Sequence, residues 1–231
     1  MTARETLRDQ RGDAACIIGV KSAVLVRQLD AKGVPWLYFD KAYNRDWPKW
    51  WRVSYRGHQP TDYLMDLDCP PDRAAAQRWR PRAWRHVALD APVLFVGASL
   101  KYHLFCDLGD PTEYAQEVVR RLRELTQRPI IYRPKPSWAA AEAVSGASFS
   151  HGKAKAAQGI MDDLEGAHAM VTHGSAAVLE GLLAGVPAIV LGHAVTRPIS
   201  STSLESVDDP LLASEADRMR LLSNLAYCQW T

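Results

Sequence analysis

Short apolar runs alternate along the chain with longer segments whose apolar positions recur at helical spacing. The short runs, rich in β-branched and aromatic residues, predict strands at 15–20, 34–39, 51–55, 93–96, 129–133, 168–172 and 188–191. Helical spacing, with starting and ending signals, predicts helices at 21–32, 71–85, 111–126 and 215–225, and one more between the last two strands. Strands that alternate with helices predict an α/β protein with parallel sheets.

A proline-containing interval, 81–92, separates two groups of these elements, because a strongly apolar strand begins directly after it. We therefore expect two Rossmann-like halves with parallel sheets, 1–90 and 91–231. In open sheets of this kind, ligands bind beyond the carboxyl ends of the strands, where the strand order reverses. The residues that follow each predicted strand are therefore the first candidates for a site.

The segment 170–192 carries the strongest signal, since it predicts strand, turn, helix, turn and strand in that order. Its first turn, His173-Gly174-Ser175, has small and polar residues where the N-terminus of a helix presents unbonded N–H groups to an anion. Glu180 lies further into the helix, where a carboxylate could reach a ribose diol. The pattern indicates a nucleotide site, although similar joints also occur in α/β proteins that bind no nucleotide.

Polar pairs follow two other strands of the second half, Ser99 with Lys101 and Arg133 with Lys135. We expect both pairs to meet the Ser175 turn at one edge of the sheet. Arginine offers forked donors and lysine a point charge, so Arg133 and Lys135 could offset the charge of a phosphate leaving group without a metal ion. The alternative is a surface pair in a proline-rich loop.

A transfer reaction that inverts configuration also needs a base, and two residues of the first half are candidates. Asp40 stands at the end of a predicted strand, and His58 lies in a polar loop. Neither residue type specifies catalysis by itself.

The composition is that of a folded globular protein, with 47% hydrophobic residues, 23% charged residues and a formal net charge of +2. The four cysteines have no C-x-x-C spacing, and no apolar run is long enough for a signal sequence or membrane helix, so we expect a cytoplasmic protein. Most of the tryptophans and an excess of basic residues lie within 1–90. This suits DNA or a glycan as a partner, or simply a tryptophan-rich core with a solvated basic face.

On Gly174, Ser175, Glu180 and the run Gly185-Val186-Pro187, the segment resembles the carboxyl-terminal half of GT-B glycosyltransferases and related nucleotide-sugar enzymes. Gly181 stands where that pattern commonly has alanine, which weakens the helix by about 1 kcal/mol. The stretches 38–43, 52–55 and 128–136 are similar, more loosely, to small glycosyltransferase-like proteins of tailed phages and capsule loci. The chain is short for a complete GT-B enzyme.

The resemblance implies a compact GT-B-like glycosyltransferase that moves a sugar from a nucleotide-sugar, such as a UDP-sugar, to a glycan or a modified base in DNA. If the chain is phage-encoded, it would act in the host cytoplasm. No clear D-x-D metal motif is present, because the stretch with Asp66, Asp68 and Asp72 lacks the spacing of a metal loop, and this favours a metal-independent donor site and leaves bound magnesium open. Other possibilities are an epimerase-like or nucleotide-sugar-binding relative without transferase activity, and a DNA-binding accessory protein. The sugar, the nucleotide, the stereochemistry and the oligomeric state stay open.

Overall fold

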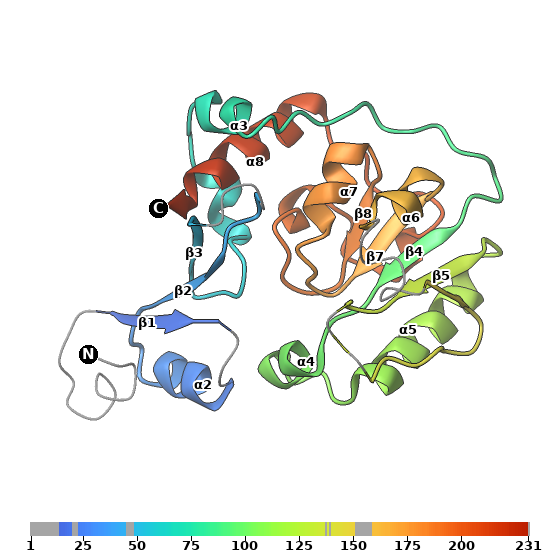
Figure 1. Cartoon of the computed structure of the whole chain (residues 1–231), viewed down its shortest axis with the longest axis horizontal. Helices are drawn as coiled ribbons and strands as arrows, with labels where there is room; N and C mark the ends of the chain where they lie inside the picture. Colours follow the sequence, from blue (N-terminus) through green and yellow to red (C-terminus); the bar gives the residue numbers. More distant parts are fainter. Residues whose placement is uncertain are drawn as a thin grey trace.

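Two β-sheets, linked by the long segment 77–92, organise the chain (Figure 1). The computed structural model describes residues 14–19, 23–44, 49–136, 138, 140–150 and 159–230. The first sheet has four strands in the order β1-β2-β3-β9, and the second has five in the order β6-β5-β4-β7-β8. The expected α/β class is confirmed.

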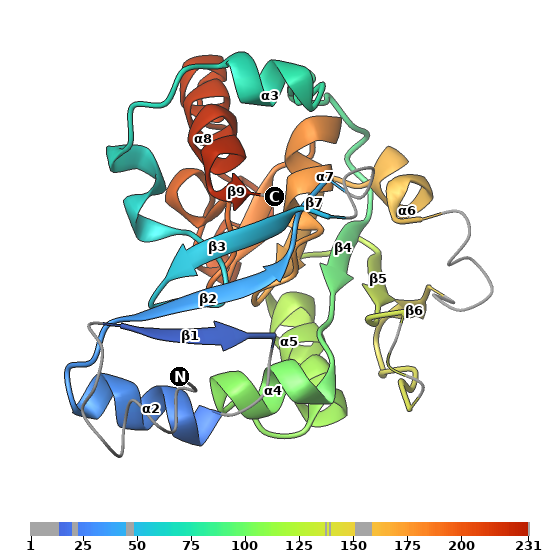
Figure 2. The same cartoon turned by 60° about the vertical axis from the view of Figure 1, so that its left-hand side comes forward.

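The first sheet contains β1 (Ala15–Ile18), β2 (Trp36–Lys41) and β3 (Trp51–Tyr55), with α2 (Ala23–Ala31) on one side (Figure 2). Alternate residues of β1 and β2 are buried in a small core with Leu29 of α2, which is the period-two pattern of a sheet with one covered face. β1 and β2 pair in parallel, whereas β2 and β3 pair antiparallel. This sheet is therefore mixed, where an all-parallel one was expected.

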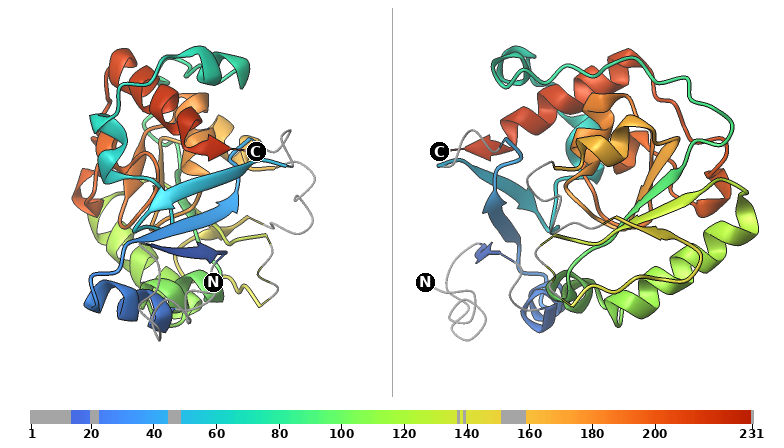
Figure 3. Two further views of the ribbon diagram at one scale, coloured as in Figure 1. Left: turned by 90° about the vertical axis from the view of Figure 1, so that its left-hand side faces the viewer. Right: turned by 45° about the vertical axis from the view of Figure 1, so that its right-hand side comes forward.

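The C-terminal segment returns to the first sheet, where β9 (Gln229–Trp230) pairs antiparallel with β3 (Figure 3). The preceding helix, α8 (Glu215–Tyr227), packs against α3 (Asp72–Ala76) and the short 3-10 helix η1 (Asp62–Asp66). The division into 1–90 and 91–231 stays a prediction, and the last residues join the sheet of the first group.

A buried asparagine fastens α8 to the segment after η1. The side-chain amide of Asn224 donates to the carbonyls of Leu64 (2.6 Å) and Leu67 (2.9 Å), and its oxygen accepts from the N–H of Cys69 (2.9 Å). Because these bonds satisfy the amide fully, the asparagine is stable in a fully buried position.

The second sheet is parallel throughout. Its strands are β4 (Val93–Val96), β5 (Ile130–Arg133), β6 (Ser148–Phe149), β7 (Ala169–Thr172) and β8 (Ala188–Val190). Every residue of β4, β7 and β8 is buried, as expected for parallel strands with helices on both faces.

Two clusters of apolar side chains cover the two faces of this sheet. On one face, Val93 and Phe95 pack with α5 (Pro111–Leu125), whose first turn is capped by the Asp110 carboxylate. On the other face, Leu94 and Val96 pack with residues of α6 (Met161–Glu165), α7 (Val178–Ala184) and α8. The chain thus places β4 at the centre of the second core.

The strand order creates a switch point beside β4. From β4 the chain continues to β5 and β6 on one side, and then returns to place β7 and β8 on the other. The connections that leave the carboxyl ends of β4 and β7 therefore diverge, which opens a crevice between them where ligands bind in α/β sheets.

Most of the expected elements are present, and one predicted helix is wrong. The helix expected over 71–85 ends at Ala76, because Arg78 has a positive φ of 57° and Pro81 disfavours helix at the residue before it. The short elements α4 (Leu100–Cys106), η2 (Arg197–Ile199), η3 (Leu204–Ser206) and β6 were not expected. Residues 20–22 of the predicted first strand and helix lie outside the described part. None of the described helices has the length and apolarity needed to cross a membrane.

Candidate functional site

The carboxyl ends of β4, β7 and β8 face the polar loop 56–59 of the first sheet. A buried hydrogen bond joins the two sides, because the side-chain amide of Gln59 donates to the carbonyl of Gly174 at 2.6 Å. Thr172 anchors the turn from below, since its hydroxyl donates to the carbonyl of Val96 on the neighbouring strand at 2.8 Å. The switch point is thus held against the first sheet at a defined place.

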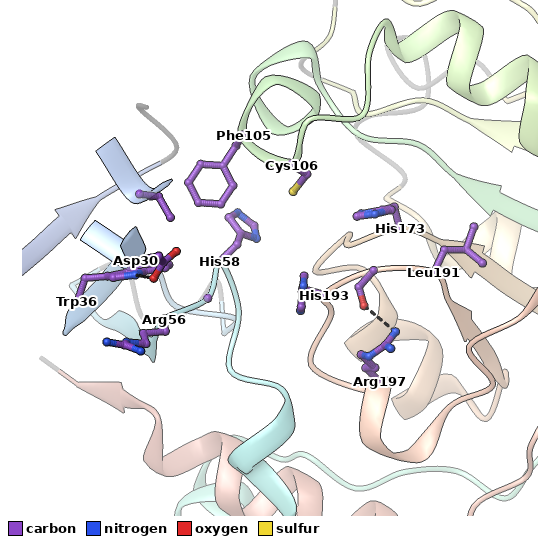
Figure 4. A pocket seen from close by; sticks show the side chains of 13 residues that line it. Asp30, Trp36, Arg56, His58, Phe105, Cys106, His173, Leu191, His193 and Arg197 are labelled. Atoms are coloured by element: carbon purple, nitrogen blue, oxygen red, sulfur yellow. Dashed lines mark hydrogen bonds between the residues drawn. The ribbon is translucent and has the colours of Figure 1, made fainter. Parts of the chain in front are cut away.

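A cavity of about 420 Å³ lies between these loops, within the size range of small-ligand sites. Figure 4 shows its polar lining, in which side chains of both sheets point toward a common space. The residues that line it are Val26, Asp30, Trp36, Arg56, Gly57, His58, Phe105, Cys106, His173, Leu191, Gly192, His193 and Arg197. Two of these residues, Arg56 and Arg197, are cations, and one, Asp30, is an acid. The Asp30 carboxylate is already engaged, because it accepts from the indole N–H of Trp36 at 2.8 Å. The wall therefore favours an anionic ligand.

His173, which follows β7 and which the sequence predicted as a site residue, lies on the wall of this cavity, and its role in binding stays a prediction. Its Nδ1 lies 3.0 Å from the hydroxyl oxygen of Tyr102. Burial, together with the nearby His193, His103 and Arg197, lowers the pKa of His173 to about 4. The imidazole is therefore neutral at physiological pH, which makes it a hydrogen-bonding group and not a fixed positive charge.

His58 reaches the same cavity from the first sheet. Its ring lies among the rings of Tyr38, Tyr102 and Phe105, with centroid separations of 5.2, 5.2 and 6.1 Å. Burial holds the pKa of His58 well below its usual range, and the charges of Arg52 and Lys135 lower it further. Its Nδ1 is buried and makes no hydrogen bond within the described residues. The imidazole is therefore neutral, and it can accept a proton from a ligand only through the part of the ring that lines the cavity.

Asp40, the other predicted base, is already engaged. Its carboxylate accepts from Nη2 of the buried Arg52 at 2.7 Å and from the N–H of Lys41 at 2.8 Å. Arg52 also lies over the ring of Tyr43, 5.0 Å from its centroid. These contacts give Asp40 a place in holding Arg52 at the cleft, and they leave His58 as the less committed of the two candidate bases.

Arg133 and Lys135 occupy different environments, although they are two residues apart. Arg133 is buried, forms an ion pair with Asp163, and donates to the carbonyl of Gly159 at 2.9 Å. A direct contact between Arg133 and a phosphate would have to break this pair. Lys135 is exposed, so the structure places the lysine, and not the arginine, where a ligand can meet it.

Lys135 belongs to a charged group on the cleft that includes Lys101 and the Asp40–Arg52 pair. Although Lys135 is exposed as a residue, desolvation by the surrounding protein lowers the pKa of its amine, and the charges of Arg52 and Lys101 lower it further, while Asp40 opposes them. Ser99 precedes α4, and its side chain makes no hydrogen bond that caps this helix. The strand-end residues Ser99, Lys101 and Lys135 therefore lie on one edge of the sheet, as parallel pairing requires.

The turn at 173–175 has its own internal bonds. The N–H of Ser175 donates to the hydroxyl of Thr172, and the N–H of Ala177 donates to the hydroxyl of Ser175, both at 3.2 Å. The helix that follows, α7, has seven residues and begins at Val178. Glu180 lies half-buried in its first turn. The turn is therefore more closed than the sequence pattern predicted, and the open space lies beside it.

Several residues of the site were not identified from the sequence, namely Arg56, His193 and Arg197 of the cavity wall and Tyr102 behind it. His193 and Arg197 follow β8 directly, so the rule that ligands meet strand ends could have found them. Arg197 donates to the carbonyls of Val190 (3.2 Å) and Gly192 (3.1 Å), which fixes the loop after β8. Tyr102 gave no signal, because its contact with His173 depends on tertiary packing.

Across the described ranges, no group of three His, Cys, Asp or Glu side chains is arranged to hold a metal ion.

No family model matches the sequence, and no curated protein matches it. Among solved structures, the chain is similar to KpsC of Thermosulfurimonas dismutans, a beta Kdo 2,4 transferase, with 16% sequence identity and a TM-score of 0.45. The likeness covers 79% of this chain and 70% of the KpsC chain. A likeness at this identity and TM-score supports no inference about the function of this chain.

Proposed function

We propose that this chain is a glycosyltransferase that binds a nucleotide-activated sugar in the cleft between its two sheets. The observation that carries the proposal is the switch point between β4 and β7, which opens beside a cavity of about 420 Å³ with a cationic wall. The resemblance of 170–192 to nucleotide-sugar sites supports the class of ligand. A diphosphate or monophosphate sugar ester matches both the charge and the place of this cavity.

The phosphates would meet the cations at the edge of the sheet. Lys101 and Lys135 lie close enough for the charge of one to lower the pKa of the other, so an anion between them would relieve their repulsion. Cations placed in advance around a leaving phosphate stabilise the charge that grows as the glycosidic bond breaks. We assign this role to the two lysines, with Arg133 anchoring the strand end below Lys135.

The nucleoside would lie toward α7. Glu180, in the first turn of this helix, is the candidate for a hydrogen bond to the ribose diol, and Gly174 and Ser175 of the preceding turn are the candidates for contact with the phosphates.

His58 is the proposed base. In an inverting transfer the acceptor oxygen attacks the anomeric carbon, the bond from that carbon to the phosphate oxygen breaks, and the leaving phosphate keeps the electron pair. The proton of the acceptor hydroxyl passes to the neutral imidazole of His58, which lines the cavity. The acceptor, a glycan or DNA, would approach from the side of the first sheet.

The test begins with a thermal-shift screen of nucleoside mono- and diphosphates and their sugar esters. A ligand that binds only the folded protein at a hundred times its Kd stabilises it by about 2.7 kcal/mol, which gives a clear rise in Tm. We expect Lys135→Ala and Glu180→Ala to reduce the rise produced by the preferred ligand. Arg80→Ala is the matched control, since Arg80 is an exposed cation outside the cavity, just after α3.

Transfer itself is measured as nucleotide release from the preferred sugar ester, with and without glycan or DNA acceptors. His58→Ala should lower kcat by about a hundredfold while nucleotide affinity changes little. Ligand binding without transfer to any acceptor would contradict the proposal in favour of a binding or epimerase-like relative. Salt-dependent retention on DNA with no nucleotide affinity would contradict it in favour of a DNA-binding protein.

A further inference from the structure

One hydrogen bond stands behind the cavity wall. The hydroxyl of Tyr102 lies 3.0 Å from Nδ1 of His173, and the two rings meet edge to face with centroids 5.8 Å apart. Tyr102 is buried and does not line the cavity, whereas His173 does. Tyr102 therefore acts on a ligand indirectly, through lining side chains that it touches: His173 by a hydrogen bond and His58 by an edge-on ring contact, of which Tyr102→Phe would remove only the hydrogen bond.

Two glycines leave the space that this pair of rings occupies. A Cβ atom at Gly174 would lie 1.8 Å from the hydroxyl oxygen of Tyr102, and a Cβ atom at Gly192 would lie 2.1 Å from Cε1 of His173. Both distances are far shorter than van der Waals contact, so neither position accepts a side chain while the rings stay in place. The loops after β7 and β8 are thus shaped around the hydrogen-bonded pair.

The chemistry of the two groups indicates the direction of the bond. Burial raises the pKa of Tyr102, so the phenol keeps its proton, and His173 is neutral because its pKa is lowered to about 4. The thiol of Cys106 also hydrogen-bonds to Tyr102, but sulfur is a weak acceptor compared with an imidazole nitrogen. The phenol therefore donates to Nδ1, and the neutral ring must carry its proton on Nε2.

We infer that Tyr102 is a positioning residue, which holds neutral His173 with its proton on Nε2 as a hydrogen-bond donor to the ligand in the cavity. Within the described part of the chain, Nε2 makes no hydrogen bond, so its N–H is left for a ligand, and Figure 4 shows the ring extending into the cavity. The inference rests on the proposed function, because the phosphate or sugar oxygens of a nucleotide-sugar are the acceptors that this donor would meet.

Nitrogen-15 NMR of the histidine side chains tests the tautomer without any substrate, since a protonated and an unprotonated ring nitrogen have separate chemical shifts. We expect an unprotonated Nδ1 and a protonated Nε2 for His173 in the unaltered protein, and a mixture of tautomers in Tyr102→Phe. Tyr114→Phe is the matched control, because Tyr114 meets the same ring edge-on, with centroids 6.0 Å apart, and has no hydrogen bond to it in the described residues. A proton on Nδ1 in the unaltered protein, or an unchanged tautomer in Tyr102→Phe, would overturn the inference.

Kinetics with the nucleotide-sugar that gives the largest thermal shift tests the consequence. Tyr102→Phe should lower kcat about tenfold, which is the scale seen when a functional histidine loses the partner of its second nitrogen. In a His173→Gln background the same change should cost less than twofold, because an amide N–H donor cannot change tautomer. Equal losses in the two backgrounds would assign Tyr102 a purely structural role.

The two proposals can fail separately. If no nucleotide or nucleotide-sugar raises Tm, the proposed function is wrong, and the ligand-donor part of the inference fails with it. The NMR measurement then still decides whether Tyr102 sets the tautomer of His173. If nucleotides bind and the tautomer is mixed in the unaltered protein, only the inference about Tyr102 is wrong.

Discussion

Replacing Arg133 with methionine separates an anchoring role from direct ligand binding. Its guanidinium is buried beneath the cleft, where it pairs with Asp163 and donates to the carbonyl of Gly159 at 2.9 Å. The two charged side chains are only 5% and 10% exposed. Methionine keeps most of the apolar stem and removes the charge, so Arg133→Met leaves the Asp163 carboxylate buried without its cation.

The expected loss follows from this burial. Removing one partner of a buried ion pair costs about 3–5 kcal/mol, because the remaining charge is not solvated. This is a large fraction of a folding stability of about 5–15 kcal/mol. With a urea m-value of about 3 kcal/mol/M, a loss near 3 kcal/mol lowers the midpoint by about 1 M. The variant is therefore still expected to be folded in buffer.

Urea unfolding followed by circular dichroism measures the loss, with Arg120→Met as the matched control. Arg120 pairs with Glu117 and Glu124 on the surface of α5, and exposed pairs contribute about 0–1 kcal/mol. In the double variant with Asp163→Asn, the combined loss should be smaller than the sum by about 2 kcal/mol. A loss below about 1 kcal/mol in Arg133→Met, together with abolished nucleotide binding, would refute the anchoring role.

Three further predictions concern the cavity loops and the C-terminal helix. Gly192→Ala should destabilise the protein by about 1–3 kcal/mol in urea, because the new Cβ would lie 2.1 Å from the ring of His173. The folded pKa of His173, about 4, lies below its unfolded value of 6.5. Its contribution to the free energy of unfolding should therefore be fully present above pH 6.5 and be lost as the pH falls toward 4. His173→Gln should flatten this fall, and an unchanged pH profile would contradict the prediction. Asn224→Ala should cost about 2–3 kcal/mol, since it leaves the buried carbonyl of Leu64 and the N–H of Cys69 without this partner and removes one of the two donors to the carbonyl of Leu67; a loss below about 0.5 kcal/mol would refute this.

Much of the second sheet could be predicted from sequence, because its strands are short apolar runs and its helices have clear boundaries. Gly185 shows why, since it has the left-handed conformation, with φ of 75°, that ends α7 where the pattern placed a C-terminal glycine. The antiparallel pairing of β2 and β3, and the return of β9 to the first sheet, could not be predicted. They depend on contacts between residues far apart in sequence, such as Gln229 with Arg52.

The candidate site was predicted in its location more than in its contacts. Strand-end residues such as Lys135 and His173 lie where a parallel sheet must place them. The partner of each side chain was not predictable, because Arg133 meets Asp163 and His173 meets Tyr102 only after the fold is formed. Spacing along the chain indicates which edge a residue occupies, and tertiary packing decides whether it faces the ligand.

An NMR titration with the nucleotide that gives the largest thermal shift decides whether a nucleotide-sugar binds at the switch point of the second sheet, on the side that faces the first sheet. We expect the largest changes at the imidazoles of His58, His173 and His193 and at the backbone of Ser175, while residues of α8 are unaffected. Changes confined to another part of the molecule, or a screen in which no nucleotide binds, would contradict this expectation.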